Sequence, residues 1–185
     1  MTHENKFGMF IHWGLYAVTE LQDQAIIRYQ LPREEYEGLI SQFAPVNYDP
    51  ERWVLLAKEA GMEYICFTTK HHDGFAMFDS AYSDFTVMHT PYGRDITKEL
   101  ALACEKHGLI FCLYYSQLQD WEDPNGSGEV RTDELDDKVL TQCAVAFCEA
   151  VKAGGYQPMV YSNLTYFYLT RTFHFKFHST HISIS

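Results

Sequence analysis

The chain has 185 residues, a formal net charge of −11 at pH 7, 46% hydrophobic and 21% charged residues. This balance is typical of a globular domain with a hydrophobic core. The negative charge argues against nucleic acid or an anionic membrane as a partner, because both require a basic surface. No run of about 18 apolar residues predicts a membrane span. No signal peptide precedes the first apolar run, so we expect either a cytoplasmic protein or a chain whose start is missing.

The five cysteines favour a reducing compartment. Their number is odd, no C-x-x-C motif is present, and three of them lie in apolar runs. We therefore expect small buried thiols rather than disulfides or metal ligands. The residues concerned are Cys66, Cys104, Cys112, Cys143 and Cys148.

A first apolar strand is followed by three copies of one pattern, in which a helix, a glycine and a buried strand succeed one another. The glycines Gly61, Gly108 and Gly155 recur every 47 residues. Strands that alternate with helices predict a parallel sheet, and nearly continuous apolar strands predict a sheet covered on both faces. The strands are expected at residues 7–13, 63–69, 109–115 and 157–162.

The helices are recognised by their ends. Asp49 and Pro50 are typical of a helix start, as is Asp95 before the second copy, and the glycines are typical of helix ends. A further helix is predicted at residues 33–42. The apolar faces are expected to comprise Trp53, Leu56, Ala57 and Ala60 in the first copy, Leu100, Ala103 and Cys104 in the second, and Val139, Leu140, Cys143, Ala144, Phe147 and Val151 in the third.

Two α/β architectures fit this order: part of a (β/α)8 barrel, or an open doubly wound sheet. A whole barrel needs about 250 residues, so four strands would make about its first half. No G-x-G-x-x-G follows a strand, which disfavours a dinucleotide-binding sheet. Residues 120–133 form a polar loop and the expected internal boundary. From residue 164 an alternating, Phe-rich tail predicts an edge strand or irregular structure.

The ends of three predicted strands carry imidazoles, phenols, indoles and a lysine. In parallel α/β folds the active site lies at these carboxyl ends. Such side chains suit a ligand rich in hydroxyl groups, since polar groups bind the hydroxyls and aromatic faces cover the C–H side of a sugar ring. The ordinary alternative is structural histidines. The groups are His12-Trp13-Gly14, Lys70-His71-His72-Asp73, and Tyr114-Tyr115-Ser116 with Asp120-Trp121.

Zinc is the second functional alternative, with His12, His71, His72 and Asp73 as ligands. Adjacent residues of a strand point to opposite faces, so this set converges only if the strand has already ended, and we expect no metal site. The tail histidines His174, His178 and His181 have helical spacing, but the alternating phenylalanines around them indicate a strand.

Glycoside hydrolysis requires two carboxylates, about 5–5.5 Å apart in retaining enzymes and about 6.5–9.5 Å apart in inverting ones. Nothing in the sequence pattern marks one of the nearby carboxylates as nucleophile or acid. The candidates are Asp73, Asp79, Asp84, Asp120, Glu122 and Asp123.

Several motifs together resemble the α-L-fucosidases of glycoside hydrolase family 29. They are Phe7-Gly-Met-Phe-Ile-His-Trp-Gly14, Lys70-His-His-Asp-Gly-Phe75, Asp79-Ser80, Arg94-Asp95, and Leu113-Tyr-Tyr-Ser116 followed by Asp120-Trp121. The resemblance covers residues 6–121. It implies a (β/α)8-like catalytic domain and a retaining, metal-free mechanism, without a cofactor, that releases α-linked L-fucose from glycans. The family residues that match His12, His71, His72 and Tyr114 bind the fucose hydroxyls.

The chain departs from this pattern in two places. The family has a sugar-contacting Glu-Trp pair in the loop after the first strand, where this chain reads Leu21-Gln-Asp-Gln-Ala-Ile-Ile-Arg-Tyr29. The family's nucleophile, an aspartate in a Trp-x-Asp-Gly motif, and its acid/base have no match here. Residues 137–163 are instead similar to a helix and strand of the family 25 muramidases, whose Asp-x-Glu pair is also missing.

We therefore expect one partial barrel domain over residues 1–163, fucosidase-like to residue 132 and a helix–strand unit from 133, with a tail over 164–185. The predicted function is a retaining α-L-fucosidase acting on fucosylated glycans, in a truncated or chimeric copy with poor or no activity. A non-catalytic sugar-binding fragment and a muramidase fragment are the alternatives. Unpaired barrel edges predict self-association.

Overall fold

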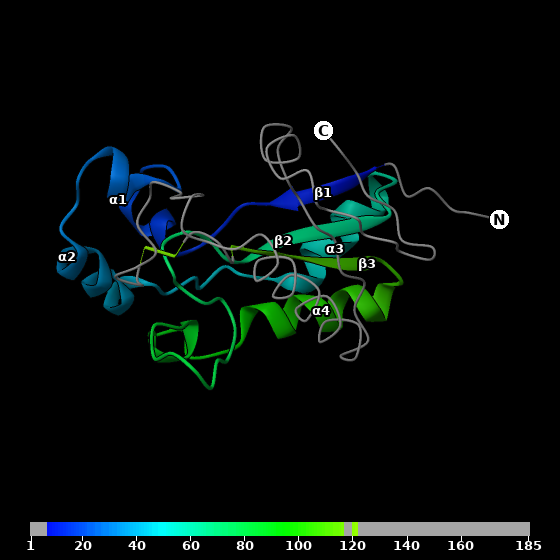
Figure 1. Cartoon of the computed structure of the whole chain (residues 1–185). Helices are drawn as coiled ribbons and strands as arrows, with labels where there is room; N and C mark the ends of the chain where they lie inside the picture. The colour runs from blue at the N-terminus through cyan, green and yellow to red at the C-terminus, as the bar shows by residue number, and fades with distance from the viewer. Residues whose placement is uncertain (1–6, 117–119, 122–185) are drawn as a thin grey trace, which may run out of the picture.

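The computed structural model describes residues 7–116, 120 and 121 (Figure 1). The predicted third helix, fourth strand, tail and domain boundaries lie outside these residues. The elements are β1 (Gly8–Ile11), η1 (Leu15–Thr19), α1 (Ala25–Arg28), α2 (Arg33–Gly38), η2 (Leu39–Gln42), α3 (Pro50–Glu59), β2 (Tyr64–Lys70), η3 (Val87–His89), α4 (Ile96–His107) and β3 (Ile110–Tyr115).

The described strands form a parallel sheet in the order β1-β2-β3. The fold class is therefore α/β, as predicted, and the three strands lie where the apolar runs placed them. β1 is shorter than the predicted 7–13, since its pairing with β2 covers only Gly8 to Ile11. His12 and Trp13 thus follow the strand instead of ending it.

The ends of the two long helices have the predicted chemistry. The side chain of Asp49 accepts a hydrogen bond of 2.9 Å from the Arg52 N–H at the start of α3. Asp95 accepts one of 2.7 Å from the Lys98 N–H at the start of α4. Gly108 ends α4 at φ 72°, a left-handed conformation that glycine adopts without a steric cost.

The predicted apolar face of α3 is partly wrong. Val54 and Ala57 are fully buried, whereas Leu56 is 58% exposed. The helix packs against both β2 and α4, so its buried stripe runs through residues 53, 54 and 57 and turns Leu56 toward solvent. The predicted face of α4 is confirmed, with Leu100 and Cys104 inaccessible.

One face of the sheet forms the core with α3 and α4 (Figure 1). Ile65 and Phe67 of β2 and Phe111 of β3 belong to this core. Because strand residues alternate between faces, the neighbours Cys66 and Cys112, which pair with each other in register, lie on the opposite face. The functional site described below lies at the carboxyl end of that opposite face.

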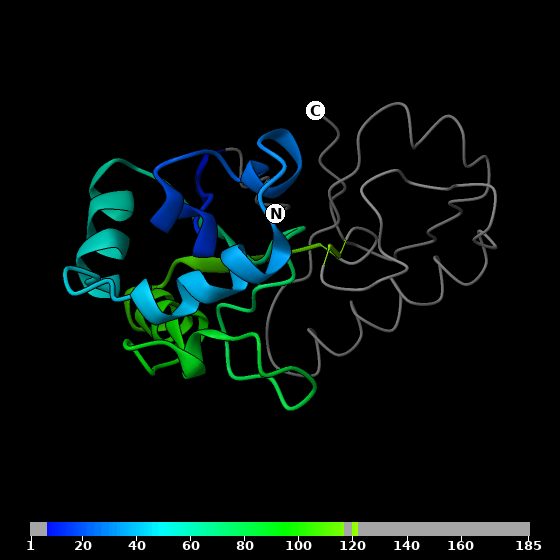
Figure 2. The same ribbon diagram turned by 90° about the vertical axis from the view of Figure 1, so that its left-hand side faces the viewer.

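The connection after β1 passes over the carboxyl ends of the strands. The predicted helix at 33–42 is present as two pieces, α2 and the 3₁₀ turn η2. In Figure 1, α1 and α2 lie beyond the strand ends, and Figure 2 views the molecule from that side. This connection therefore covers the end of the sheet where a site is expected.

The thiols follow the prediction where the structure describes them. Cys66, Cys104 and Cys112 are free and buried, and burial raises the pKa of Cys66 and of Cys104 to about 12. Cys143 and Cys148 lie outside the described residues.

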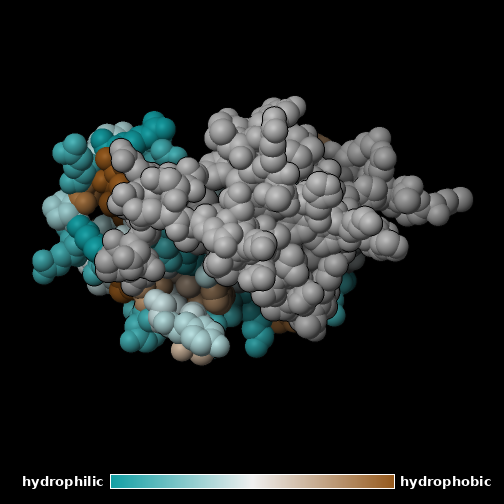
Figure 3. Space-filling model, in the orientation of Figure 1, coloured by the Kyte–Doolittle hydropathy of each residue, from teal (hydrophilic) through white to brown (hydrophobic). Residues whose placement is uncertain are grey.

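The described residues present a surface of mixed hydropathy. On the face shown in Figure 3 these residues are mainly hydrophilic, with small hydrophobic patches. Among the helices of residues 7–116, none is both long and apolar enough to cross a bilayer.

Candidate functional site

Three of the residues predicted to bind sugar meet at the carboxyl end of the sheet. The ring centroids of His12 and His71 are 4.6 Å apart, and those of His71 and Tyr114 are 5.7 Å apart with an angle of 18° between the planes. His12 and Tyr114 are separated by 6.4 Å. One residue from each strand end thus contributes to a single cluster.

A bulge in β2 brings His71 into this cluster. Thr68 pairs with Tyr114, but Lys70 pairs with Tyr115, so β2 has one extra residue at this point. The ammonium of Lys70 accordingly lies 5.0 Å from the centre of the Tyr115 ring, on the face away from Tyr114. The next residue, His71, then points to the same side as Tyr114.

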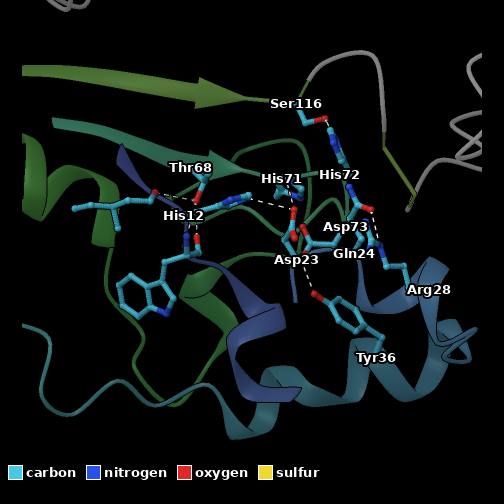
Figure 4. A network of polar contacts seen from close by, with 12 residues as sticks. His12, Asp23, Gln24, Arg28, Tyr36, Thr68, His71, His72, Asp73 and Ser116 are labelled. Carbon is cyan, nitrogen blue, oxygen red and sulfur yellow. Dashed lines mark hydrogen bonds and ion pairs between the residues drawn. The ribbon is translucent and has the colours of Figure 1, made fainter. Parts of the chain in front are cut away.

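Asp23 completes the cluster, and sequence reasoning missed it. It lies in the turn between η1 and α1, and its Oδ2 is 3.6 Å from His12 Nε2 and 3.5 Å from His71 Nε2 (Figure 4). The family resemblance places a Glu-Trp pair in this connection. A lone carboxylate in the same connection was the available signal.

His71 is held neutral. His71 is 4% exposed, and its pKa is lowered to about 3. Burial is the largest cause, followed by the charges of the neighbouring His72, His12 and Lys70. Its Nε2 faces Asp23, and its buried Nδ1 has no hydrogen-bond partner among the described residues. A neutral imidazole offers one donor and one acceptor, which matches the two capacities of a sugar hydroxyl.

His72 lies beside the first cluster and faces another direction. Its Nδ1 is 2.6 Å from Ser116 Oγ, and its ring is 5.5 Å from that of Trp121. Burial is the main cause that lowers its pKa. The fourth predicted sugar-binding residue is therefore next to His71, with a ring separation of 4.1 Å, and is oriented by Ser116, the residue after β3.

Asp73 stabilises the turn that carries both histidines. It is 3% exposed and accepts hydrogen bonds from the Tyr36 hydroxyl at 2.6 Å and from the Phe75 N–H at 3.3 Å. Burial outweighs these bonds and raises its pKa to about 6. Its carboxylate is bonded toward α2, so Asp73 is a structural residue of the turn (Figure 4).

Lys70 is occupied by β3 and the segment that follows. Its Nζ donates to the Ser116 carbonyl at 2.9 Å and lies 2.7 Å from Asp120 Oδ2. The carboxylate of Asp120 is therefore bound in this ion pair as well. Neither side chain is therefore placed like the histidines for contact with a ligand.

The two indoles of the strand ends have different environments. Trp13 packs in the core against Phe43 at 5.6 Å and Trp53 at 5.5 Å, so its expected role at the site is wrong. The alternation that aims His12 at the site turns the next residue to the opposite face. Trp121 contacts His72, and its buried Nε1 has no partner among the described residues.

The remaining candidate carboxylates lie on the surface or outside the described residues. Asp79 is exposed, and the side chain of Asp84 is fully exposed and 3.9 Å from His89 Nε2. Glu122 and Asp123 are not described. The four residues weighed as zinc ligands, and not favoured, do not converge, because His72 and Asp73 bind other partners. Asp23 takes the place beside His12 and His71.

Comparison with known proteins identifies similar sequences. A sequence model described as Alpha-L-fucosidase matches residues 2–165, which includes the segment 137–163. The tissue alpha-L-fucosidase of Rattus norvegicus is 33% identical over 138 residues, and the plasma alpha-L-fucosidase of Homo sapiens is 33% identical over 137 residues. These alignments cover 65% and 64% of this chain.

Solved structures give a concordant result. The alpha-L-fucosidase AlfC from Lactobacillus casei, solved in complex with alpha-L-fucose product, aligns with a TM-score of 0.65 and 45% identity over 70% of this chain and 43% of its own. An alpha-L-fucosidase of family GH29 from Bacteroides thetaiotaomicron aligns with a TM-score of 0.67 and 31% identity over 80% of this chain and 36% of its own. The chain spans about 30% of the length of the rat relative.

Proposed function

The chain belongs to the alpha-L-fucosidase family, and from this premise we propose that its described residues form the fucose-binding part of a retaining α-L-fucosidase site. The observation that carries the proposal is the cluster of His12, Asp23, His71 and Tyr114 at the carboxyl ends of three parallel strands. The substrate would be a glycan with α-linked L-fucose.

The cluster has the chemistry that a deoxy sugar requires. His71 is neutral, so it can donate to one hydroxyl and accept from another. Asp23 accepts hydrogen bonds from hydroxyl groups, and bonds to a charged acceptor are stronger than neutral ones. The Tyr114 ring, stacked on His71, supplies an apolar surface for the C–H groups and methyl of fucose. In this proposal Asp23 supplies the polar contact of the Glu-Trp pair.

The proposal also includes an architecture. β1, β2 and β3, each followed or preceded by helices on the outer face, would be the first three strands of a (β/α)8 barrel, with the site at the barrel mouth. The parallel order of the strands and the packing of α3 and α4 on one face of the sheet support this reading.

Fucose binding can be tested by fluorescence. We expect L-fucose to change the emission of Trp121 with a dissociation constant in the millimolar range, roughly −4 kcal/mol. Trp13 and Trp53 are partly buried and pack against the core. A Trp121→Phe variant therefore measures the emission that these two residues contribute. D-fucose, the mirror image, is the control sugar.

Two variants test whether the L-fucose response arises from the cluster of His12, Asp23, His71 and Tyr114. His12→Ala should weaken L-fucose binding. His89→Ala, which changes an exposed side chain at the end of η3, should not. An equal response to both sugars, or a response that His12→Ala leaves unchanged, would contradict the proposal.

Of the two alternatives, the sugar-binding fragment shares the binding outcome and the muramidase does not. A non-catalytic sugar-binding fragment would show the same L-fucose response without turnover. A muramidase would clear peptidoglycan, and the segment that suggests it, residues 137–163, lies outside the described residues.

A further inference from the structure

We propose that His12, Asp23 and His71 also form a binding site for a divalent transition-metal ion of the zinc class. The side chains come from the ends of β1 and β2 and from the turn before α1, and their donor atoms all lie within 4.8 Å of one another. Two imidazoles and one carboxylate are a common ligand set for zinc, with water at the fourth position. The metal would occupy the cluster itself, as an inhibitor of sugar binding and not as a participant in glycoside hydrolysis.

The distances agree with this geometry. Metal bonds of about 2.0–2.1 Å in a tetrahedral site place neighbouring ligand atoms about 3.4 Å apart. Asp23 Oδ2 is 3.6 Å from His12 Nε2 and 3.5 Å from His71 Nε2. Two edges of the tetrahedron are thus already formed. The half-exposed His12 side chain, at 43%, has the freedom to shorten the third edge.

The buried ligand has the ring atoms that a metal requires. His71 is 4% exposed, its Nδ1 has no partner among the described residues, and its Nε2 faces Asp23. The single proton of a neutral ring can reside on Nδ1, which leaves the Nε2 lone pair for the ion. The exposed side of His12 supplies the entry path.

Other histidine–carboxylate pairs of the described residues lack this arrangement. Glu51 faces His107 but is also bound by Lys106, whose Nζ is 2.6 Å from the same oxygen. Asp84 and His89 offer only two ligand atoms, which lie 3.9 Å apart, and both side chains are exposed. Within residues 7–116, 120 and 121, three donors converge only at His12, Asp23 and His71.

Metal and sugar would exclude each other, and this part of the inference rests on the proposed function. His12 and His71 cannot give the same Nε2 atoms to an ion and to fucose hydroxyls. A zinc-class ion would therefore weaken L-fucose binding, and L-fucose would displace the ion.

Co²⁺ is a suitable probe, because it absorbs visible light when it is four-coordinate. Three nitrogen or oxygen ligands from the protein and one water would give such a site. The full 185-residue chain, stripped with a chelator, is titrated with Co²⁺ and then back-titrated with Zn²⁺. We expect a visible band at one equivalent that Zn²⁺ abolishes. Asp23→Asn and His12→Ala should each weaken binding about tenfold or more, since loss of a direct ligand costs at least as much as loss of a supporting residue.

The controls separate this cluster from the other histidines. His89→Ala, and a chain with His174, His178 and His181 all changed to Gln, should keep the band. Circular dichroism shows whether Asp23→Asn and His12→Ala remain folded. A band that survives both cluster variants, or one that the tail variant removes, would overturn the proposal. A band that requires the cluster but persists in L-fucose would support the metal site and count against the proposed function.

Discussion

The hydrogen bond between Tyr36 and Asp73 determines how firmly the histidine turn is held. Asp73 is nearly inaccessible, and the Tyr36 hydroxyl is one of its two hydrogen-bond donors in the described contacts, at 2.6 Å. Tyr36→Phe removes this donor and leaves a buried acceptor with one bond fewer. We expect a loss of about 1.5–3 kcal/mol in the free energy of unfolding.

Urea denaturation at neutral pH measures this loss. Tyr82→Phe is the matched control, because Tyr82 is completely exposed and its substitution should change stability by less than about 0.5 kcal/mol. Equal stabilities of the two variants would show that α2 does not stabilise the turn.

The buried thiols give a second prediction for individual residues. Burial raises the pKa of Cys66 to about 12 and of Cys112 to about 11, so almost no thiolate is present at neutral pH. Iodoacetamide should leave Cys66, Cys104 and Cys112 unmodified in the native chain and alkylate all three in urea. Peptide mapping by mass spectrometry distinguishes them from Cys143 and Cys148. Rapid native labelling of Cys66 would contradict the buried inner face of the sheet.

Among the elements, α3 and α4 differ in what their N-terminal aspartates bind. Asp49 accepts one backbone hydrogen bond from Arg52. Asp95 accepts from Lys98 and also from the Asp79 N–H at 3.1 Å, so it joins the helix to the loop after β2. We expect Asp49→Ala to cost about 1 kcal/mol and Asp95→Ala about 2 kcal/mol.

Chemical denaturation of the two variants and the parent chain checks this order. A cost for Asp95→Ala no larger than that for Asp49→Ala would mean that the Asp79 contact contributes nothing to stability.

The strands and helices show which features a local sequence pattern can predict. Apolar runs and helix ends predicted β2, β3, α3 and α4 because these signals are local. The bulge at residues 68–70 depends on the pairing between β2 and β3, which no local pattern encodes, and it alone brings His71 to the side of His12 and Tyr114. Leu56 was assigned to the wrong face for a similar reason, since the rotation of α3 is set by contacts with α4 and β2.

The part of the candidate site that short sequence motifs form was predictable. The part that depends on tertiary contacts was not. Adjacent histidines after a strand indicated the cluster, and the family resemblance assigned them to a sugar. Asp23 and Tyr36 come from the connection after β1, where the path of the chain over the strand ends decides which side chain arrives. The roles of Lys70 and Trp13 were likewise decided by neighbours distant in the sequence.

For the whole molecule, we expect this 185-residue chain to bind fucose without hydrolysing a fucoside. The residues that resemble the family's sugar contacts are present, but neither the nucleophile nor the acid/base motif has a match in the sequence. Loss of a nucleophile lowers the rate by many orders of magnitude. We expect no release of nitrophenol from nitrophenyl α-L-fucoside above a His71→Ala control. Turnover that depends on His71 would contradict this prediction.

The proposed contact of His12 and His71 with fucose can be tested by NMR of the histidine rings. In the chain labelled at its histidines, with a chelator present, L-fucose should shift the ring signals of His12 and His71, assigned by His12→Gln and His71→Gln variants. The signals of His89, on η3, and of His107, at the end of α4, should stay in place. Shifts confined to other histidines, or equal shifts with D-fucose, would contradict the account.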